Sequence, residues 1–546
     1  MELLIKKYAL LNAVQHNGEA NPKAVIGKLI QENPSLKKNI KELLKRVTDI
    51  VEEINAMPLE EQRELLQEFK IEKPKKKTEE EIKPLPNVKG SVVMRFEPSP
   101  SGPLHIGHIH TLLLNDIYCK LYKGKLYLRI SDTNPENIYL LAYQMIPEDA
   151  KWLAKIYKTI VQSERLEIYY RYAEKLIKQG HAYVCTCKQE KFKELASKSK
   201  PCPCRELPPK EHLSRWEKMF SSFQPGEAVL RIKTDIKHKN PAVRDWPAFR
   251  IVKEKHPKKP KVRVWPLMNF SVAIDDILQG MTHIIRGKDH IVNTERQLYL
   301  YRYLNKKEPV FIHIGRINFT DLKISTTEIR KSIQAKKFIG WDDPRLPFLR
   351  ALKRRGYQRE AFVKLTKHFG LSKVDKKISK NEFFKLLNAY NKEIIEPLAN
   401  RYFFIENPEL VEIKNAPELT VKIPLHPDFP ERGYRLFKTS TKFYVQDKLE
   451  KNKIYRFMHL FNFKNKQFSS IELDPKLNAK LIHWLPASKD LVKVEIMMPD
   501  ASIKQGLAEP AVRNLEVGSI IQFERFGFCR LDKKLKHRLV FWFAHK

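Results

Sequence analysis

The chain has 546 residues, and its 102 Lys and Arg side chains exceed its 64 Asp and Glu side chains, so the formal net charge is +38. This length suits three or four domains with hydrophobic cores, and the charge makes a polyanion such as nucleic acid the leading partner class, although a solvated basic surface would carry the same excess. No apolar run is long enough to span a bilayer, no basic signal region follows Met1, and six cysteines do not make a disulfide framework in so long a chain, so we expect a cytoplasmic protein.

The first 90 residues divide into a helical part and a linker. Over residues 1–70, apolar side chains such as Leu43, Val47 and Ile50 recur at helical spacing, which predicts a small helical bundle rather than a membrane or partner helix. Residues 71–90 combine prolines with blocks of charge and have no apolar period, which is typical of a linker.

Residues 91–183 alternate strand-like and helical patterns, which is the order of a parallel α/β sheet. The first strand runs into a turn rich in Pro, Ser and Gly, and a helix follows whose first turn holds His105 and His108. A helix N-terminus attracts phosphate, and Gly102 and Gly107 permit close approach of a ligand. Two imidazoles on one helix face can donate hydrogen bonds to phosphate oxygens as charge develops on them.

Residues 184–260 interrupt this pattern with an insert rich in Cys, Pro and Lys. Two CxC pairs with 14 residues between them supply four candidate metal ligands, Cys185, Cys187, Cys202 and Cys204. Four thiolates suit a tetrahedral Zn²⁺ ion that would order the insert, and four reduced, packed thiols are the alternative. The isolated Cys119 and Cys529 are expected to be ordinary packed thiols.

The α/β pattern then resumes, with buried strands expected over 262–274 and 281–286 and a helix from about 290 to 304. Residues 325–400 are helical and basic, and from about 402 onward short apolar strands between turns predict β-barrels.

Aromatic and cationic side chains interleave in this C-terminal part, as in surfaces that stack and read unpaired bases, although barrel cores also need aromatics. The residues concerned are Arg432, Tyr434, Arg435, Phe437, Lys438, Arg525, Phe526, Phe528 and Arg530.

The run RFEPSPSGPLHIGH, residues 95–108, resembles the HIGH signature of class I aminoacyl-tRNA synthetases with the flanks of their glutamyl and glutaminyl branch. LRISDTNP at 128–135, the passage 263–297, and GWDDPRL followed by LRALKRRG within 340–356 are similar, in the same order, to segments of archaeal-type glutamyl-tRNA synthetases. The resemblance covers roughly residues 90 to 360.

This resemblance implies an α/β Rossmann-type catalytic domain with an inserted acceptor-binding domain, a helical N-terminal extension, a helical connector and C-terminal anticodon-binding β-barrels. The expected boundaries are 1–70 for the extension, 71–90 for the linker, 91–183 and 261–324 for the catalytic halves, 184–260 for the insert, 325–400 for the connector and 401–546 for the barrels.

The implied reaction is the ATP-dependent attachment of glutamate to tRNA(Glu), through a glutamyl-adenylate, at the 2′-OH of the terminal adenosine. Mg²⁺ would accompany ATP, and the protein would act as a monomer in the cytoplasm. A glutaminyl-tRNA synthetase shares the same signatures, and an inactive tRNA-binding paralogue is a further alternative. The sequence leaves open whether tRNA(Gln) is charged as well.

The resemblance also implies the site residues. Lys323–Thr327, KISTT, is similar to the KMSKS loop, whose cations and hydroxyls meet the departing pyrophosphate. The catalytic residues would be His105, His108, Lys323 and Ser325. The ATP-binding residues would be Pro98, Gly102, Gly107, Thr326 and Thr327. The amino-acid-binding residues would be Arg95, Glu97, Ser99, Ser131, Met268 and Arg286, and the metal ligands the four clustered cysteines.

Three positions depart from the family pattern. Thr326 replaces the second Lys of the loop, a cation that Arg330 or Lys331 could supply. Ser131 stands where the family usually has the acid that pairs with the substrate ammonium, and Glu97 is our candidate substitute. Several relatives also carry Tyr in place of Met268. The basic stretches 253–261 and 353–355 would suit tRNA phosphates.

Overall fold

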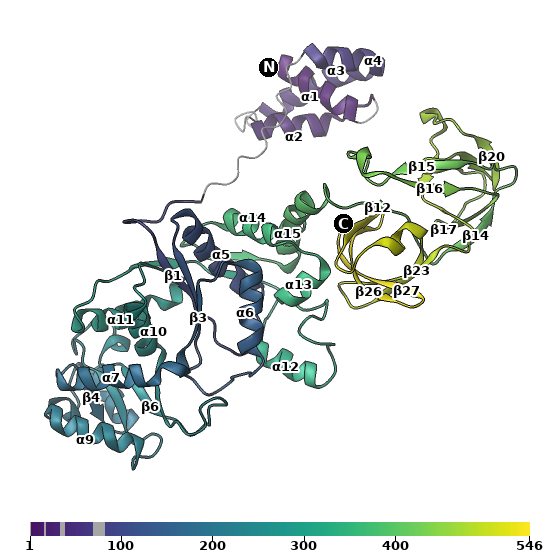
Figure 1. Cartoon of the computed structure of the whole chain (residues 1–546). Helices are drawn as coiled ribbons and strands as arrows, with labels where there is room; N and C mark the ends of the chain where they lie inside the picture. Colours follow the sequence, from purple (N-terminus) through teal and green to yellow (C-terminus); the bar gives the residue numbers. More distant parts are fainter. Residues whose placement is uncertain (1, 16–17, 33–38, 69–81) are drawn as a thin grey trace. The chain divides into compact units, whose positions relative to one another are not determined.

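The computed structural model describes residues 2–15, 18–32, 39–68 and 82–546, so the first part of the expected linker, 71–81, lies outside the described residues. The chain divides into two compact units, Met1–Glu81 and Ile82–Lys546 (Figure 1). In the part of the chain that the structure describes, no helix is both long enough and apolar enough to cross a bilayer.

The N-terminal unit contains the expected helices. They are α1 Glu2–Gln15, α2 Pro22–Glu32, α3 Ile40–Asn55 and α4 Leu59–Glu68. Apolar side chains at helical spacing, among them Ala9, Leu29 and Val47, meet in one buried core. The buried Gln62 amide donates hydrogen bonds to the carbonyls of Gly18, Ile54 and Met57, so α4 is bonded to the α1–α2 connection and to the C-terminal end of α3.

The second unit begins with a parallel sheet. Its strands β1 Val93–Phe96, β2 Lys125–Ile130 and β3 Lys158–Val161 are joined through α5 Ile106–Leu121 and α6 Ala142–Leu153. Strands β8 His283–Gly287 and β9 Val310–Ile314 form a second parallel pair. Thr282 N donates to Val93 O at 2.9 Å, which places β8 beside β1. The strand order therefore changes direction between β1 and β8, and ligands of α/β proteins bind at the carboxyl ends of strands at such a point.

The insert is built on a four-stranded antiparallel sheet. Its strands are β4 Ala182–Cys185, β5 Val229–Ile232, β6 Pro247–Ile251 and β7 Val264–Pro266, so the sheet extends beyond the expected bounds of 184–260 at both ends. Helices α8 Gln189–Ser197 and α9 Pro209–Phe220 lie within those bounds, and α7 Leu166–Lys178 precedes them. The strand expected over 262–274 is wrong beyond Pro266, because α10 Met268–Leu278 begins there. Residues 269–276 are buried on all sides, so this run has no polar face to show a helical period. The helix expected near 290–304 is α11, Ile291–Tyr303.

The connector contains α12 Thr326–Gln334, α13 Leu349–Arg355, α14 Arg359–Phe369 and α15 Lys380–Ile395. Strand β11 Lys376–Ile378 of the connector pairs in parallel with β10 Ile317–Phe319, which lies in the expected second catalytic half. Ile106 N donates to Pro347 O at 3.1 Å and Leu349 N donates to Leu104 O at 3.0 Å. The segment that leads into α13 is therefore hydrogen-bonded to the turn that carries the two histidines.

The C-terminal part consists of short strands. They are β12 Arg401–Tyr402, β13 Phe404–Glu406, β14 Glu409–Glu412, β15 Thr420–Pro424, β16 Tyr434–Lys438, β17 Lys442–Val445, β18 Ile454–Phe457, β19 Asn462–Lys464, β20 Gln467–Ser470, β21 Lys480–Ile482, β22 Leu485–Pro486, β23 Val492–Met497, β24 Ile503–Ala508, β25 Ile520–Phe523, β26 Gly527–Leu535 and β27 Arg538–His545. Seven of them form one sheet in the order β12-β25-β26-β27-β23-β24-β13. Two separate aromatic-rich cores lie in this part.

Candidate active site

A cavity of about 300 Å³ opens at the carboxyl ends of β1 and β8, where the strand order changes direction. It is lined by Arg95, Phe96, Glu97, Gly107, His108, Thr111, Ser131, Met268, Val272, Ile285, Arg286, Gly287 and His290. The structure thus brings together seven of the predicted site residues, although they are up to 191 positions apart in the chain.

The two signature histidines form the N-terminal cap of α5. His105 Nδ1 accepts a hydrogen bond from Gly107 N at 3.1 Å, and His108 Nδ1 accepts one from His105 N at 3.3 Å. Burial lowers the pKa of His105 to about 4, and burial together with His105 lowers the pKa of His108 well below its ordinary value. Because each Nδ1 is an acceptor, each neutral ring carries its hydrogen on Nε2. The two imidazoles are therefore neutral Nε2–H donors at a helix N-terminus.

The two signature segments touch through Gly102 and Thr326. A Cβ added at Gly102 would lie 3.2 Å from Trp341 and 3.3 Å from Thr326, and Thr326 Oγ1 donates to Ser101 Oγ at 3.1 Å. Gly102 thus permits the close approach of Trp341 and Thr326. The sequence had predicted the close approach of a ligand at this position.

The other predicted loop residues lie outside the cavity. The Lys323 side chain is 83% exposed, with Nζ 3.6 Å from a Glu328 carboxylate oxygen. Ser325 caps α12, because its Oγ accepts a hydrogen bond from Glu328 N at 3.3 Å. Thr327 belongs to the first turn of α12, and the Arg330 guanidinium lies 5.6 Å from the Tyr139 ring centre.

A buried ionic network that the sequence did not reveal lies beneath the cavity. Arg129 is fully buried, with Nη1 3.2 Å from Glu97 Oε2 and Nη2 2.8 Å from Asp276 Oδ1. Asp275 lies 3.7 Å from Arg129 Nε. The one signal of this network in the sequence is that Arg129, Asp275 and Asp276 lie in apolar segments. Charged side chains in buried segments need partners.

Glu97 is the acid that lines the cavity. Its Oε2 faces Arg129 and Arg95, whereas its Oε1 is buried and has no hydrogen-bond partner among the described residues. Burial raises the pKa of Glu97, while the Arg129 and Arg95 charges lower it. A buried, unpartnered carboxylate oxygen in a cavity wall is a ready acceptor for a cationic ligand group.

Ser131 lines the same cavity without charge. Its Oγ donates to Gln162 Oε1 at 3.0 Å, and Gln162 Nε2 donates to Asp275 Oδ2 at 3.1 Å. Pro98 accepts a backbone hydrogen bond from Ser131 N at 3.0 Å but does not line the cavity, and Ser99 is exposed outside it.

Two guanidinium groups converge on the cavity. Arg286 Nη1 donates to Gln297 Oε1 at 3.0 Å and Nη2 donates to Thr294 Oγ1, but its buried Nε has no partner among the described residues. Burial first, and then the charge of Arg95, lower the pKa of Arg286 to about 10. Two buried cations in one cavity favour an anionic ligand that carries a carboxylate for each of them.

The four clustered cysteines are brought together in the insert. Cys185 Sγ lies 3.8 Å from Cys202 Sγ, Cys187 Sγ lies 3.8 Å from Cys204 Sγ, and all four sulfurs are within 4.8 Å of one another. A tetrahedral Zn²⁺ with Zn–S bonds of about 2.3 Å places its sulfurs about 3.8 Å apart, so the donor set fits zinc. Cys119 and Cys529 are buried elsewhere, as expected for packed thiols.

The two basic stretches differ in availability. In 253–261, His256 is fully buried, with Nε2 3.0 Å from Asp132 O, whereas the lysines at 253, 255 and 261 are exposed. In 353–355, Lys353 is exposed, whereas the Arg354 and Arg355 side chains make hydrogen bonds to other residues of the protein. Arg354 pairs with Asp342 and Asp532, and Arg355 donates to the carbonyls of Phe543 and Ala544.

The interleaved residues of the C-terminal part are also divided between core and surface. Arg435, Phe437 and Phe528 are buried, so they are not available to unpaired bases. Tyr434 and Lys438 alternate with the buried pair on β16 and are exposed.

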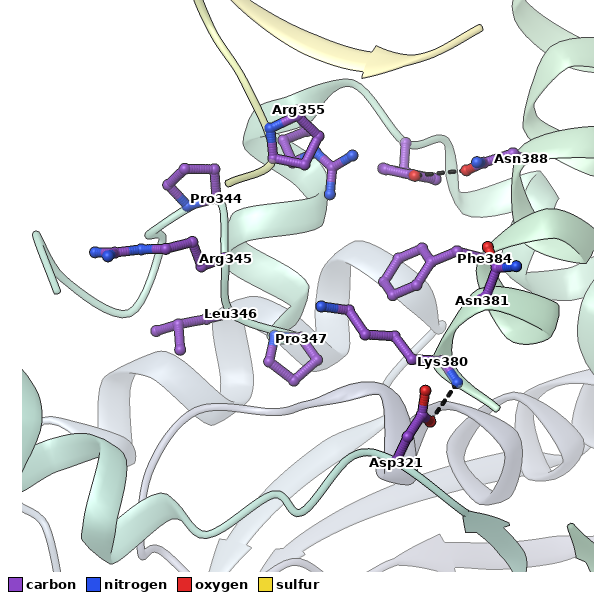
Figure 2. A pocket seen from close by; sticks show the side chains of 12 residues that line it. Asp321, Pro344, Arg345, Leu346, Pro347, Arg355, Lys380, Asn381, Phe384 and Asn388 are labelled. Atoms are coloured by element: carbon purple, nitrogen blue, oxygen red, sulfur yellow. Dashed lines mark hydrogen bonds between the residues drawn. The ribbon is translucent and has the colours of Figure 1, made fainter. Parts of the chain in front are cut away.

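A second cavity of about 330 Å³ lies away from the histidines, and none of the predicted site residues lines it. Figure 2 shows Lys380 extending between Pro347 and Phe384 in this cavity, below the Arg355 guanidinium. This second cavity is bounded by α13, α15, the loop at 344–347 and Pro499. Because seven of the predicted site residues line the cavity at β1 and β8 instead, we assign the predicted chemistry to that cavity.

Comparison with known proteins assigns most of the chain. Residues 91–396 match the family of tRNA synthetases class I (E and Q), catalytic domain, and residues 399–480 and 481–532 match two families described as the anti-codon binding domain of the same class. Over the full length of both chains, the glutamate–tRNA ligase of Methanocaldococcus jannaschii is 47% identical. Those of Methanobrevibacter smithii and Pyrococcus furiosus are each 44% identical, again over both full lengths.

Proposed function

Because the chain belongs to the class I tRNA synthetases for glutamate and glutamine, we propose from its site that it is a glutamate–tRNA ligase. The observation that carries this choice is the pair of guanidinium groups, Arg95 and Arg286, in one cavity. Glutamate offers two carboxylates to two cations, whereas glutamine offers only one.

In this proposal Arg95 and Arg286 bind the carboxylates of glutamate, and Glu97 Oε1 accepts a hydrogen bond from its ammonium group. Glu97 thereby supplies the charge that Ser131 lacks. Ser131 and Met268 shape the cavity between these groups. Arg129 holds Glu97 in place, because its guanidinium donates to the other carboxylate oxygen.

ATP would lie with its phosphates at the N-terminus of α5, where Gly107 and His108 line the cavity. The His105 and His108 Nε2–H groups then donate to phosphate oxygens while the glutamate carboxylate attacks the α-phosphorus and pyrophosphate leaves. Mg²⁺ would accompany ATP, and Lys323 with the N-terminus of α12 would approach the leaving group. The 2′-OH of the terminal adenosine next attacks the adenylate carbonyl, and AMP departs.

The cysteine cluster would hold a structural Zn²⁺ that orders the acceptor-binding insert. The exposed lysines of 253–261 are available to tRNA phosphates. Free cysteines in this number also fit a cytoplasmic protein.

The test is aminoacylation by the purified protein with ATP and Mg²⁺, using glutamate or glutamine with tRNA(Glu) or tRNA(Gln). We expect glutamate to be attached to tRNA(Glu), and the reaction with tRNA(Gln) shows whether that tRNA is charged as well. Transfer of glutamine in preference to glutamate, or of neither, would contradict the proposal.

A further inference from the structure

A continuous chain of hydrogen bonds connects Arg286 to His290, and both residues line the active-site cavity. Arg286 Nη1 donates to Gln297 Oε1 at 3.0 Å, and Gln297 Nε2 donates to Asn269 Oδ1 at 3.3 Å. Asn269 Nδ2 then donates to Asn293 Oδ1 at 3.1 Å, and Asn293 Nδ2 lies 3.1 Å from His290 Nδ1.

The direction of this chain is determined by Arg286. A guanidinium can only donate hydrogen bonds, so Gln297 must present its oxygen to Arg286 and its NH₂ group to Asn269. By the same reasoning, Asn269 presents its oxygen to Gln297 and its NH₂ group to Asn293, and Asn293 presents its oxygen to Asn269. Arg296 Nη1, a second obligate donor, lies 3.4 Å from Asn293 Oδ1 and fixes the same orientation. Asn293 therefore offers its NH₂ group to His290, whose Nδ1 must accept.

The His290 ring is neutral and carries its hydrogen on Nε2. Burial is the largest cause that lowers the pKa of His290, the charges of Arg286, Arg95 and Arg316 add to it, and Asp289 acts in the opposite direction. Asp289 Oδ2 lies 3.6 Å from His290 Nε2, beyond hydrogen-bond range, and its carboxylate is bound by Arg316. Among the described residues no acceptor lies within hydrogen-bond range of this Nε2–H group, so it can donate to a ligand in the cavity.

We propose that His290 is a specificity-determining residue that selects a carboxylate over an amide at this end of the cavity. The inference rests on the proposed function. With the ammonium of the substrate at Glu97, the side chain of the amino acid points toward Arg286 and His290. Arg286 and His290 offer only donors, which the two oxygens of the side-chain carboxylate accept, while Arg95 is left for the other carboxylate. The NH₂ group of glutamine would face donors and lose its hydrogen bonds.

Two substitutions test this inference without removing the arginines. His290→Gln keeps a donor but can also turn its oxygen toward the ligand, and Asn293→Leu breaks the chain outside the cavity. We expect either variant to lower the ratio of kcat/KM for glutamate to that for glutamine about tenfold. His537→Phe, at an exposed histidine remote from the cavity, is the control and should retain the wild-type ratio.

An independent measurement is the ¹⁵N NMR spectrum of the protein labelled in its histidines, with the His290 signal identified by its absence from His290→Gln. We expect Nδ1 of His290 to be unprotonated and Nε2 protonated. A wild-type selectivity ratio in both variants, or a hydrogen on Nδ1, would overturn the inference. If wild-type protein charges tRNA with neither amino acid, the proposed function fails, and the spectrum still decides whether the donor chain exists.

Discussion

At the scale of single residues, the signature histidines owe their chemistry to the backbone around them. Both Nδ1 atoms are occupied as acceptors in the cap of α5, so both rings present Nε2–H groups. A neutral donor pair strengthens its hydrogen bonds as charge develops on phosphate oxygens and needs no proton transfer.

Replacing either histidine removes one of these donors. We expect His105→Ala or His108→Ala to lower the rate of ATP–pyrophosphate exchange, measured with glutamate and tRNA, by ~10²–10³-fold, because the lost interaction is strongest in the transition state. Affinity for tRNA should stay nearly unchanged. Wild-type exchange rates in both variants would contradict the role assigned to the histidines.

Glu97 provides a second prediction at this scale. Glu97→Gln should raise the KM for glutamate by ~10-fold or more and change the KM for ATP little, because the substrate ammonium loses its charged partner. Glu148→Gln, at an exposed acid of α6, is the matched control. A normal KM for glutamate in Glu97→Gln would show that another group binds the ammonium.

At the scale of elements, α13 joins two distant parts of the second unit. Its first residue is hydrogen-bonded to the histidine turn, and Arg354 near its end makes two hydrogen bonds of 2.8 and 2.7 Å to Asp532 on β26. This single helix therefore connects the histidine turn to the seven-stranded sheet through hydrogen bonds at both of its ends.

Breaking a largely buried ion pair leaves uncompensated charge, so we expect Arg354→Ala to lower the free energy of unfolding by ~3 kcal/mol. Arg538 pairs with Glu495 at 2.9 Å and is more exposed, so Arg538→Ala should cost less than ~1 kcal/mol. Chemical denaturation of the two variants gives this comparison, and equal losses would show that Arg354 is an ordinary surface residue.

The insert is the other element that depends on specific contacts. The purified protein should contain about one zinc ion per chain, and Cys202→Ser should release it, because a tetrahedral site with three thiolates binds zinc less tightly. Hydrogen exchange should increase within 184–225 and not across the whole fold. Cys119→Ser should retain the metal, and a zinc-free wild-type protein would refute the site.

At the scale of the whole molecule, the charge is unevenly distributed. Residues 1–81 contain 15 basic and 15 acidic side chains, so the entire excess of 38 positive charges lies in residues 82–546. The second unit therefore carries the whole net positive charge that would attract tRNA.

Deleting residues 1–81 should leave the Kd for tRNA within about twofold of the full-length value. The slope of log Kd against log salt concentration should also be unchanged, because we expect the cations that contact phosphates to lie in residues 82–546. Filter binding at several salt concentrations makes the measurement. A slope reduced by one or more would show that the N-terminal unit binds phosphates.

The sequence by itself determined the family, the kinds of elements and most of the residues around the cavity. Helices and strands follow from local periodicity, and a signature such as HIGH is local as well, so both can be read without the fold. Where a helix is buried on every side, as in α10, its sequence has no alternation of apolar and polar residues at helical spacing. The sequence therefore predicted a strand there in place of a helix.

Only the tertiary structure decided which side chains act together. Arg129 and Asp276 are 147 positions apart, and Arg354 and Asp532 are 178 apart, so no local pattern pairs them. Folding also determined that Arg355 donates hydrogen bonds to carbonyls of β27, and that His290 lies at the end of a chain of hydrogen-bonded amide side chains. The physical reason is that a hydrogen bond depends on distance and orientation in space, which residues acquire only when the strands and helices that carry them pack together.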